Sequence, residues 1–462
     1  MSSSLAKGGI CSVVLFLFPA LSQGQVCSGA DDIPRSAWFP MSNASLTQWL
    51  GFDPEQEAQS DYTAARDKWS SMDIAALRQH AWMLWSALTA DSKTSRPPAT
   101  RPSSFQTLPR WQTWYPAEDV LRASLQPPPN RLKFSPDDQR MLLLEFPRQL
   151  RKPEPPSRNK QIAPVRESVV LSSALYNSVT CEQIVTHHLG DSGVKNNLLY
   201  NKKTHDITSF QGHEDAMALK TMWMRISRDG CDHIPVWDGI PGVPKATDNQ
   251  NITWPRTVSV RVRRGQVCGN SSSTVDLDDF YWYQLGDPKE VDRIQSLFPP
   301  DGVHTGDFMI LVGMHVATRE IPNWVWSTFW WHDHPVYGAF AADRPSPSLI
   351  RGTWRHYLMD TAYDMDRPWQ STAQPKATFN PYLEGDMPDG VRSNCMTCHR
   401  RAAWPVPNDK RETLSSKGVG LEFRNIVVTG SEAATASYFP EYEDLLRLSF
   451  LWTLARPDPP PN

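Results

Sequence analysis

Several features that mark common protein classes are missing from this chain. The sequence has no phosphate-binding glycine loop, no dinucleotide fingerprint and no recognisable catalytic triad. It has no run of basic residues, and its formal net charge is −3, which argues against nucleic acid or anionic lipid as a partner. The apolar run at 10–20 is shorter than the roughly 20 residues that span a bilayer, so we expect no membrane span in the mature chain.

Cysteine is scarce, with seven in 462 residues, yet two of the seven stand three positions apart. Cys395, Cys398 and His399 form the pattern C-x-x-C-H, which attaches a c-type haem. On one helical turn both thiols can form thioethers to the porphyrin while the next imidazole reaches the iron. A redox dithiol or half of a zinc site would use the same cysteines, but neither a nearby βαβ pattern nor a second ligand pair is evident. The sequence therefore predicts one covalent haem c with His399 as the proximal ligand.

The N-terminus predicts export from the cell. Lys7 precedes the apolar run, and a small-residue site ends at Ser22 or Gly24, as in a cleaved secretory signal. Export and a haem c pattern together indicate a periplasmic protein.

Four further cysteines would then lie in an oxidising compartment, where they can pair in three ways. They are Cys27, Cys181, Cys231 and Cys268. We expect at least one disulfide and favour Cys231 with Cys268, since both stand beside turn-like residues.

The patterning of apolar residues predicts an α+β fold with three regions after the signal peptide. The predicted boundaries are 1–22 for the signal peptide, 23–159 for a helical and Pro-rich region, 160–375 for a β-rich domain and 376–462 for a small all-α haem domain.

Individual elements support these regions. Residues 61–90 carry apolar side chains at helical spacing, and Pro116 with Glu118 can open a short helix. Runs rich in β-branched and aromatic residues predict strands, whereas 213–227 fits either a strand or a short helix. These predicted strands lie within 258–268, 307–318, 323–335 and 354–363. Residues 441–455 are apolar on nearly all sides, which predicts a buried helix.

Over about 380–456 the chain resembles the class I c-type cytochromes. The resemblance rests on Cys395, Cys398, His399 and the run LLRLSFLWTL at 445–454. It implies a haem-attachment helix and a closing helix packed beside the haem, with electron transfer through a partly exposed haem edge.

The sixth iron ligand departs from that family, in which a downstream methionine usually supplies it. Residues 400–462 contain no methionine and no histidine, so the position is either empty or filled from upstream. We favour His315, which lies in the most apolar predicted strand, or Met387, which lies eight residues before Cys395. Arg400 and Arg401 are candidates to pair with the haem propionates, because guanidinium groups suit carboxylates.

A second resemblance covers the β-rich region. The string GMHVAT followed by PNWVWSTFW, within 313–330, looks like a motif of uncharacterised monohaem periplasmic proteins and implies that this domain and the haem occur together. The tryptophans at 324–331 predict core aromatics, a wall beside the haem or a partner surface. His332 and His334 would share one face of a strand as metal ligands with Asp333 opposite, or stand in a polar loop.

These observations predict a periplasmic c-type cytochrome that transfers one electron at a time to an unidentified redox partner protein. Two other functions stay open. With an empty sixth position the haem could bind a small oxidant and act as a peroxidase- or oxygenase-like enzyme on a substrate held by the central domain. Alternatively, the central domain could dock one partner and deliver electrons to it.

Overall fold

The computed structural model describes most of the β-rich part of the chain and shorter pieces on either side. The described residues are 26–33, 74–95, 107–125, 132–133, 144, 170–210, 213, 215–239, 254, 256–269, 273–296, 302–319, 324–338, 340–341, 343–346, 349–362, 378–385, 395, 399, 402–405 and 445–455.

The helices within these residues are short apart from one. They are α5 (Ile74–Thr89), α6 (Ala117–Ser124), α7 (Ser178–Thr186), α8 (Ser192–Asn196) and α9 (Pro288–Gln295), with the turns η1 (Arg110–Thr113), η3 (Asn197–Asn201), η4 (Leu277–Asp279), η5 (Gly352–His356) and η10 (Trp452–Ala455). No helix of the described residues is both long and apolar enough to cross a membrane.

The strands carry most of the fold. They are β1 (Cys27–Ser28), β2 (Asp91–Ser95), β3 (Thr107–Pro109), β4 (Tyr115–Pro116), β5 (Leu132–Lys133), β6 (Val170–Tyr176), β7 (Met217–Ile226), β8 (Asp232–Val236), β9 (Arg256–Arg261), β10 (Thr274–Asp276), β11 (Trp282–Gln284), β12 (Phe308–Thr318), β13 (Val325–Trp331), β14 (Tyr357–Ala362), β15 (Ala403–Trp404) and β16 (Leu446–Arg447).

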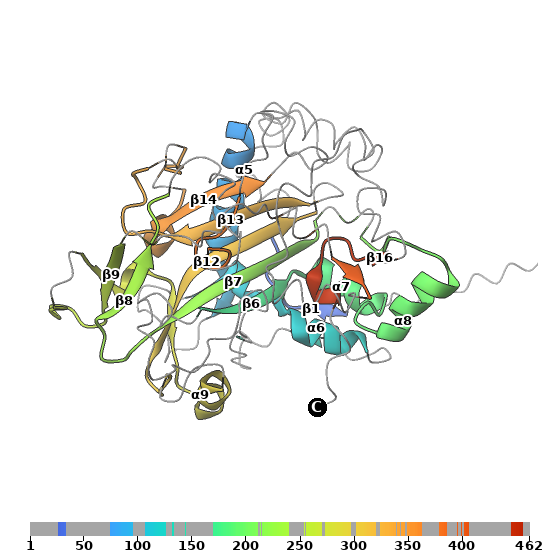
Figure 1. The fold of residues 1–462 in the computed structure, drawn as a ribbon, viewed down its shortest axis with the longest axis horizontal. Coiled ribbons are helices and arrows are strands. Elements are labelled where there is room, and N and C mark those ends of the chain that lie inside the picture. Colours follow the sequence, from blue (N-terminus) through green and yellow to red (C-terminus); the bar gives the residue numbers. More distant parts are fainter. Residues whose placement is uncertain are drawn as a thin grey trace, which may run out of the picture.

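A seven-stranded antiparallel sheet forms the centre of the molecule (Figure 1). Its order is β14-β13-β12-β7-β6-β4, with β11 paired to the start of β12. Every residue of β13 is buried, so both faces of the sheet are covered at this strand. A smaller sheet, β10-β9-β8, lies beside one end of the central sheet (Figure 1).

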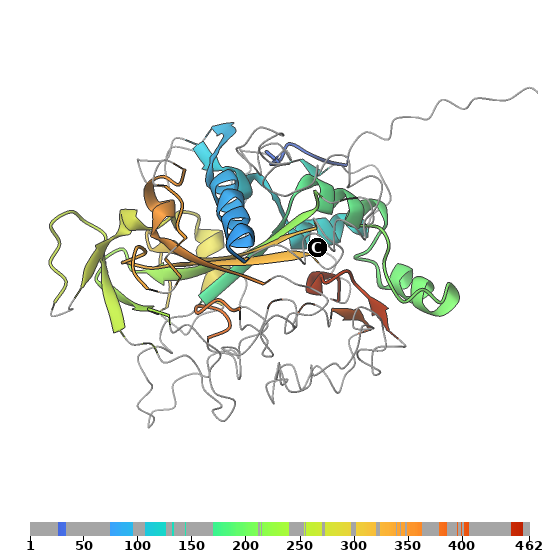
Figure 2. The ribbon, with the colours of Figure 1, turned by 90° about the horizontal axis from the view of Figure 1, so that it is seen from above.

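The helix α5 covers one face of this sheet. Trp85 stacks on Phe329 of β13 with ring centroids 4.3 Å apart, and Trp82 meets the same ring edge-on. Arg78 pairs with Asp360 of the edge strand β14 at 3.0 Å. Figure 2 shows α5 on one side of the sheet and the C-terminal strands β15 and β16 on the other.

The predicted fold class, α+β with a small all-α haem domain at the C-terminus, is wrong. The described part of 376–462 contains the strand pair β15-β16 and the single turn η10, and the described residues of the chain are dominated by antiparallel sheet. The helix predicted at 441–455 is interrupted, because Ser449 and Phe450 have left-handed φ values of 47° and 66°. A segment that is apolar on all sides fits a buried irregular path as well as a buried helix, so the pattern alone could not separate the two.

Other local predictions are confirmed. The amphipathic helix appears as α5, and Pro116 stands at the N-cap of α6. The four predicted strand runs become β9, β12, β13 and β14. The ambiguous run 213–227 forms β7, which pairs with β6 on one side and with β12 on the other.

Two disulfides close the fold. The expected pair Cys231–Cys268 is present, and Cys27 pairs with Cys181 across 154 residues. Disulfides of this kind are compatible with a secreted or periplasmic protein. The signal peptide predicted at 1–22 lies outside the described residues.

Candidate haem site

Two C-terminal segments come together around His399. Strand β15 pairs with β16 in antiparallel register, so Ala403 stands opposite Arg447. The Ala402 N–H donates to the His399 carbonyl at 3.0 Å, and the Leu448 N–H donates to the Ala402 carbonyl at 3.0 Å. After this pairing the chain turns through its left-handed residues and brings the Phe450 carbonyl to the His399 ring.

The His399 ring has one nitrogen occupied by that carbonyl. Its Nδ1 lies 2.7 Å from the Phe450 carbonyl oxygen. Because a carbonyl only accepts, Nδ1 carries the proton and Nε2 keeps its lone pair. The Trp326 ring lies against the imidazole, with centroids 4.2 Å apart. Burial lowers the pKa of His399 to about 4, which keeps the imidazole neutral near pH 7.

A buried lysine holds the same two segments from the side of α8. Lys195 is fully buried, and its Nζ donates to the Leu454 carbonyl at 2.9 Å. The ammonium also lies 4.1 Å from the centroid of the Trp404 ring, and the indole N–H of Trp404 donates to Asn196 Oδ1 at 2.9 Å. The two segments that carry His399 and Phe450 are therefore anchored to the rest of the fold.

Of the C-x-x-C-H motif, the structure describes Cys395 and His399. Cys395 and His399 both have helical backbone, and residues four apart on a helix share a face. The Cys395 thiol donates weakly to the Thr378 carbonyl at 3.7 Å and takes part in neither disulfide. The remaining residues predicted for this site, Cys398, Met387, Arg400 and Arg401, lie outside the described residues.

The predicted ligand candidate His315 lies on the same face of the sheet as His399. His315 of β12 stands opposite Thr328 of β13, and Trp326, the residue that contacts His399, is two positions along the same strand. Two strand residues span about 7 Å, so both histidines belong to one neighbourhood. The electrostatic influence of His315 on His399 agrees with this placement.

A partly buried carboxylate accompanies His315. Glu384 Oε1 lies 3.0 Å from His315 Nε2. Burial alone would raise the pKa of Glu384, but the charge and hydrogen bond of His315, together with the backbone N–H of Asn380, outweigh burial and hold this pKa below its usual value.

The tryptophan run is core. Trp324, Trp326, Trp330 and Trp331 are all buried, which confirms the simplest of the three interpretations. Trp326 alone among the four also contacts His399 through its ring. Sequence reasoning missed Phe450, Glu384 and Lys195, because each acts through a contact with a residue more than fifty positions away.

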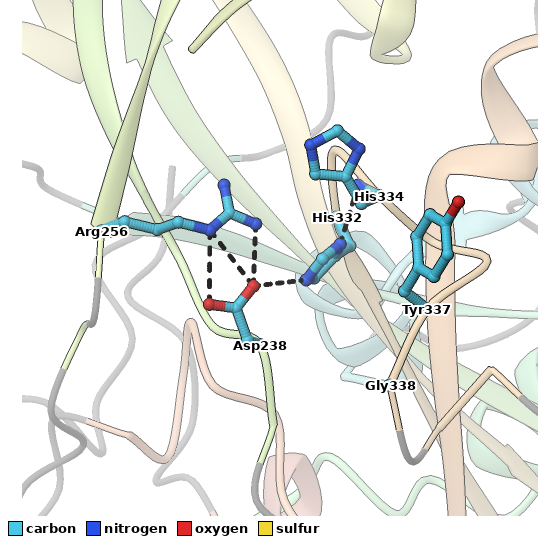
Figure 3. Close-up of a pocket in the computed structure, with 6 residues that line it drawn as sticks. All are labelled: Asp238, Arg256, His332, His334, Tyr337 and Gly338. Carbon is cyan, nitrogen blue, oxygen red and sulfur yellow. Dashed lines mark hydrogen bonds and ion pairs between the residues drawn. The ribbon is translucent and has the colours of Figure 1, made fainter. Parts of the chain in front are cut away.

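A polar cleft of about 370 Å³ opens at the other end of β13 (Figure 3). It is lined by Asp238, Arg256, His332, His334, Tyr337 and Gly338. His332 Nδ1 accepts from the His334 backbone N–H at 2.9 Å, so the proton is on Nε2, which points to Asp238 Oδ1 at 3.2 Å. Burial lowers the pKa of His332.

Arg256 neutralises the carboxylates around this cleft. Its two terminal nitrogens each lie 2.6 Å from Asp333, and Nη2 also lies 2.8 Å from Asp238. Burial would raise the pKa of Asp333, but the hydrogen bonds and charge of Arg256 outweigh it and lower this pKa. The carboxylates of Asp333 and Asp238 are therefore already paired with Arg256, and they are not free to coordinate a metal ion.

The hypothesis of a second metal at His332 and His334 gains no support. Strand β13 ends at Trp331, so both histidines lie in the following loop, and the Nδ1 of His332 is occupied by a backbone N–H. Among the described residues, no group of three or more His, Cys, Asp or Glu side chains is placed to hold a metal ion. Comparison with protein-family models, curated proteins and solved structures finds no match to this chain.

Proposed function

We propose that this chain is a c-type cytochrome that carries one covalent haem and transfers one electron at a time. Cys395 and Cys398 would form the thioethers, and His399 would bind the iron. Haem c supplies an iron that alternates between the ferrous and ferric states. The chain's own residues bind it, orient its ligand and limit the access of water.

The observation that carries this proposal is the hydrogen bond from His399 Nδ1 to the Phe450 carbonyl at 2.7 Å. Histidines that bind a metal usually donate their other ring N–H to a carbonyl or carboxylate, which fixes the tautomer and the ring orientation. His399 has this arrangement, with Nε2 left as the nitrogen that can bind iron.

The surroundings of His399 also suit a buried redox group. The nearby side chains of Trp326, Ala402, Ala403 and Leu446 are all buried and mostly apolar. A low local dielectric and few water molecules are among the levers that set the potential of a haem. The two disulfides fit the periplasmic location that haem attachment would require. The redox partner would be another protein.

The proposal is tested by producing the chain with its signal peptide in a bacterium that has the periplasmic haem-attachment machinery. The expected product is coloured, keeps its pigment in acidified acetone and gives a haem stain after denaturing electrophoresis. The double variant Cys395→Ala, Cys398→Ala should lose this stain entirely.

A matched control removes two cysteines outside the motif. The double variant Cys231→Ala, Cys268→Ala lacks the disulfide between these residues but should keep the haem stain. A colourless wild-type protein, or a pigment that washes out with acidified acetone, contradicts the proposed function.

A further inference from the structure

His315 is a partly buried histidine, with its side chain 14% exposed, and only one of its ring nitrogens has a hydrogen-bond partner among the described residues. Nε2 donates to Glu384 Oε1 at 3.0 Å, since an ionised carboxylate can only accept. Nδ1 is buried and has no hydrogen-bond partner among the described residues. Buried polar atoms in native proteins are usually paired, so an enclosed ring nitrogen without a partner is available to bind a further group.

Glu384 is held in place by a turn fixed to the sheet. Its Oε2 accepts from the Asn380 backbone N–H at 2.6 Å. The Asn380 side chain in turn donates to Thr328 Oγ1 at 2.9 Å and to the Phe329 carbonyl at 2.8 Å. The carboxylate is therefore positioned from β13, the same strand whose Trp326 contacts His399.

The absence of a side chain at Gly313 lets the turn that contains Asn380 pack closely against strand β12. The register of β12 shifts between Leu311 and Gly313, and a Cβ added at Gly313 would lie 2.8 Å from Asn380 Nδ2. Only glycine leaves room for Asn380 here. Gly313 and His315 lie two positions apart on one face of β12. Gly313 leaves space for the turn, and His315 hydrogen-bonds to Glu384 of the same turn.

The two histidines have matching arrangements. In each ring one nitrogen donates to a fixed acceptor, the Phe450 carbonyl for His399 and Glu384 for His315, and the other nitrogen of His315 is enclosed without a hydrogen-bond partner among the described residues. Either nitrogen of a neutral imidazole can bind a metal, and a carboxylate on the opposite nitrogen is a common partner of such a ligand.

We propose that His315 is the sixth ligand of the haem iron, binding through Nδ1, and that Glu384 is its positioning residue. This inference rests on the proposed function and deepens it. Two imidazole ligands leave no open position for a small oxidant, so the chain is an electron carrier rather than a peroxidase- or oxygenase-like enzyme. The carboxylate on Nε2 makes the imidazole more basic and favours ferric iron.

The main experiment compares the purified wild-type haem protein with His315→Ala. The wild type should give a low-spin ferric spectrum and no spectral response of the ferrous form to carbon monoxide. His315→Ala should become high-spin and bind carbon monoxide, and added imidazole should restore the low-spin spectrum. His304→Ala removes a half-exposed histidine and is the matched control, which should behave as wild type.

A milder variant keeps the test informative if His315→Ala fails to fold. Glu384→Gln conserves shape but removes the charge, so the haem should stay low-spin while its midpoint potential rises. A low-spin spectrum that persists in His315→Ala, or conversion to high-spin by Met387→Ala instead, overturns the inference. An unchanged potential in Glu384→Gln overturns the role of Glu384.

These outcomes separate the two proposals. A wild-type chain without covalent haem overturns the proposed function and this inference with it. A wild-type chain with covalent haem and a high-spin ferric spectrum overturns this inference alone.

Discussion

The two faces of the central sheet differ in chemistry although neighbouring residues of the same strands build both. On the face beneath α5, Trp85 and Phe329 stack, and aromatic rings fill the space between helix and sheet. On the opposite face, next to the C-terminal segments, lie the ionisable side chains His315, Glu384 and His399. Phe329 and Thr328 are consecutive residues, yet each belongs to a different face.

This difference indicates where stability and where function are built. Aromatic contacts stabilise a fold without requiring exact partners for polar atoms. Buried ionisable groups with an unsatisfied nitrogen do not favour stability, because each costs desolvation that its partners only partly offset. Such groups persist where a ligand or a reaction needs them. If the two faces are separable in this sense, a substitution on one face leaves the properties of the other unchanged.

The largest expected effect is on the helix-covered face. Trp85→Ala removes a fully buried ring that stacks on Phe329, so the free energy of unfolding should fall by about 4 kcal/mol. Chemical denaturation followed by circular dichroism measures this. The haem spectrum of the folded variant should be that of wild type. Trp85→Phe keeps an aromatic ring, so its free energy of unfolding should fall much less than that of Trp85→Ala. A changed haem spectrum in Trp85→Ala would show that the faces are coupled.

The next effect is at the cleft end of β13, where charges are buried but fully paired. Arg256→Met leaves Asp333, whose side chain is 2% exposed, without its partner, and should cost about 2 to 3 kcal/mol, less than a fully buried pair because Arg256 is partly exposed.

The difference in unfolding free energy between wild type and Arg256→Met should become smaller in acid. The folded-state pKa of Asp333 lies below the ordinary value of 3.8, so the stabilisation by Arg256 is present above pH 3.8 and is lost as the pH falls through the lower folded value. Urea unfolding at pH 7 and pH 3 measures this. Arg256→Lys keeps the charge but not the two-pronged geometry and should be intermediate. A variant as stable as wild type at pH 7 would contradict the account.

The sequence predicts elements whose signal is local. The strands β12 and β13 are rich in β-branched and aromatic residues, and α5 has apolar residues at helical spacing. The pair Cys231–Cys268 closes only 37 positions between two turn-like stretches. The C-x-x-C-H motif likewise contains its whole signal within five residues.

The rest of the site depends on contacts that no local pattern encodes. His399 meets Phe450 across 51 positions, and His315 meets Glu384 across 69. His315 was a candidate from its place in an apolar strand, but nothing near it in sequence indicates a carboxylate partner. The helix predicted at 441–455 failed for a related reason. Its described residues Leu446, Leu448, Leu451 and Leu454 are all buried, and burial from several directions produces no helical period.

Two carboxylates, Glu384 and Glu290, extend the comparison, because their pKa values move in opposite directions. Glu384 has a histidine partner, whereas Glu290 of α9 has the Tyr283 hydroxyl at 3.3 Å and burial raises the pKa of Glu290 to about 7. A carboxyl group with a raised folded-state pKa binds more protons in the folded state. Stability should therefore fall as the pH rises from 4.5 to about 7, by on the order of 2 kcal/mol.

Glu290→Gln should remove this dependence, with thermal unfolding between pH 4.5 and 8 as the measurement. Glu118→Gln, on the exposed side of α6, is the control and should keep the wild-type pH profile. If Glu290→Gln and wild type lose stability equally over this range, another group is responsible.

The smallest expected effect comes from two threonines that stand on opposite faces. Thr328→Val removes the acceptor of the Asn380 side chain, and Thr361→Val removes a hydroxyl that donates to the Trp326 carbonyl at 2.8 Å. Both hydroxyls are fully buried, so each variant should lose about 1 kcal/mol of unfolding free energy. Only Thr328→Val should also shift the midpoint potential of the haem, in the same direction as Glu384→Gln but by less, because it loosens the turn that holds Glu384. Equal potentials in the two variants would mean that the turn is held by its remaining bond to the Phe329 carbonyl alone.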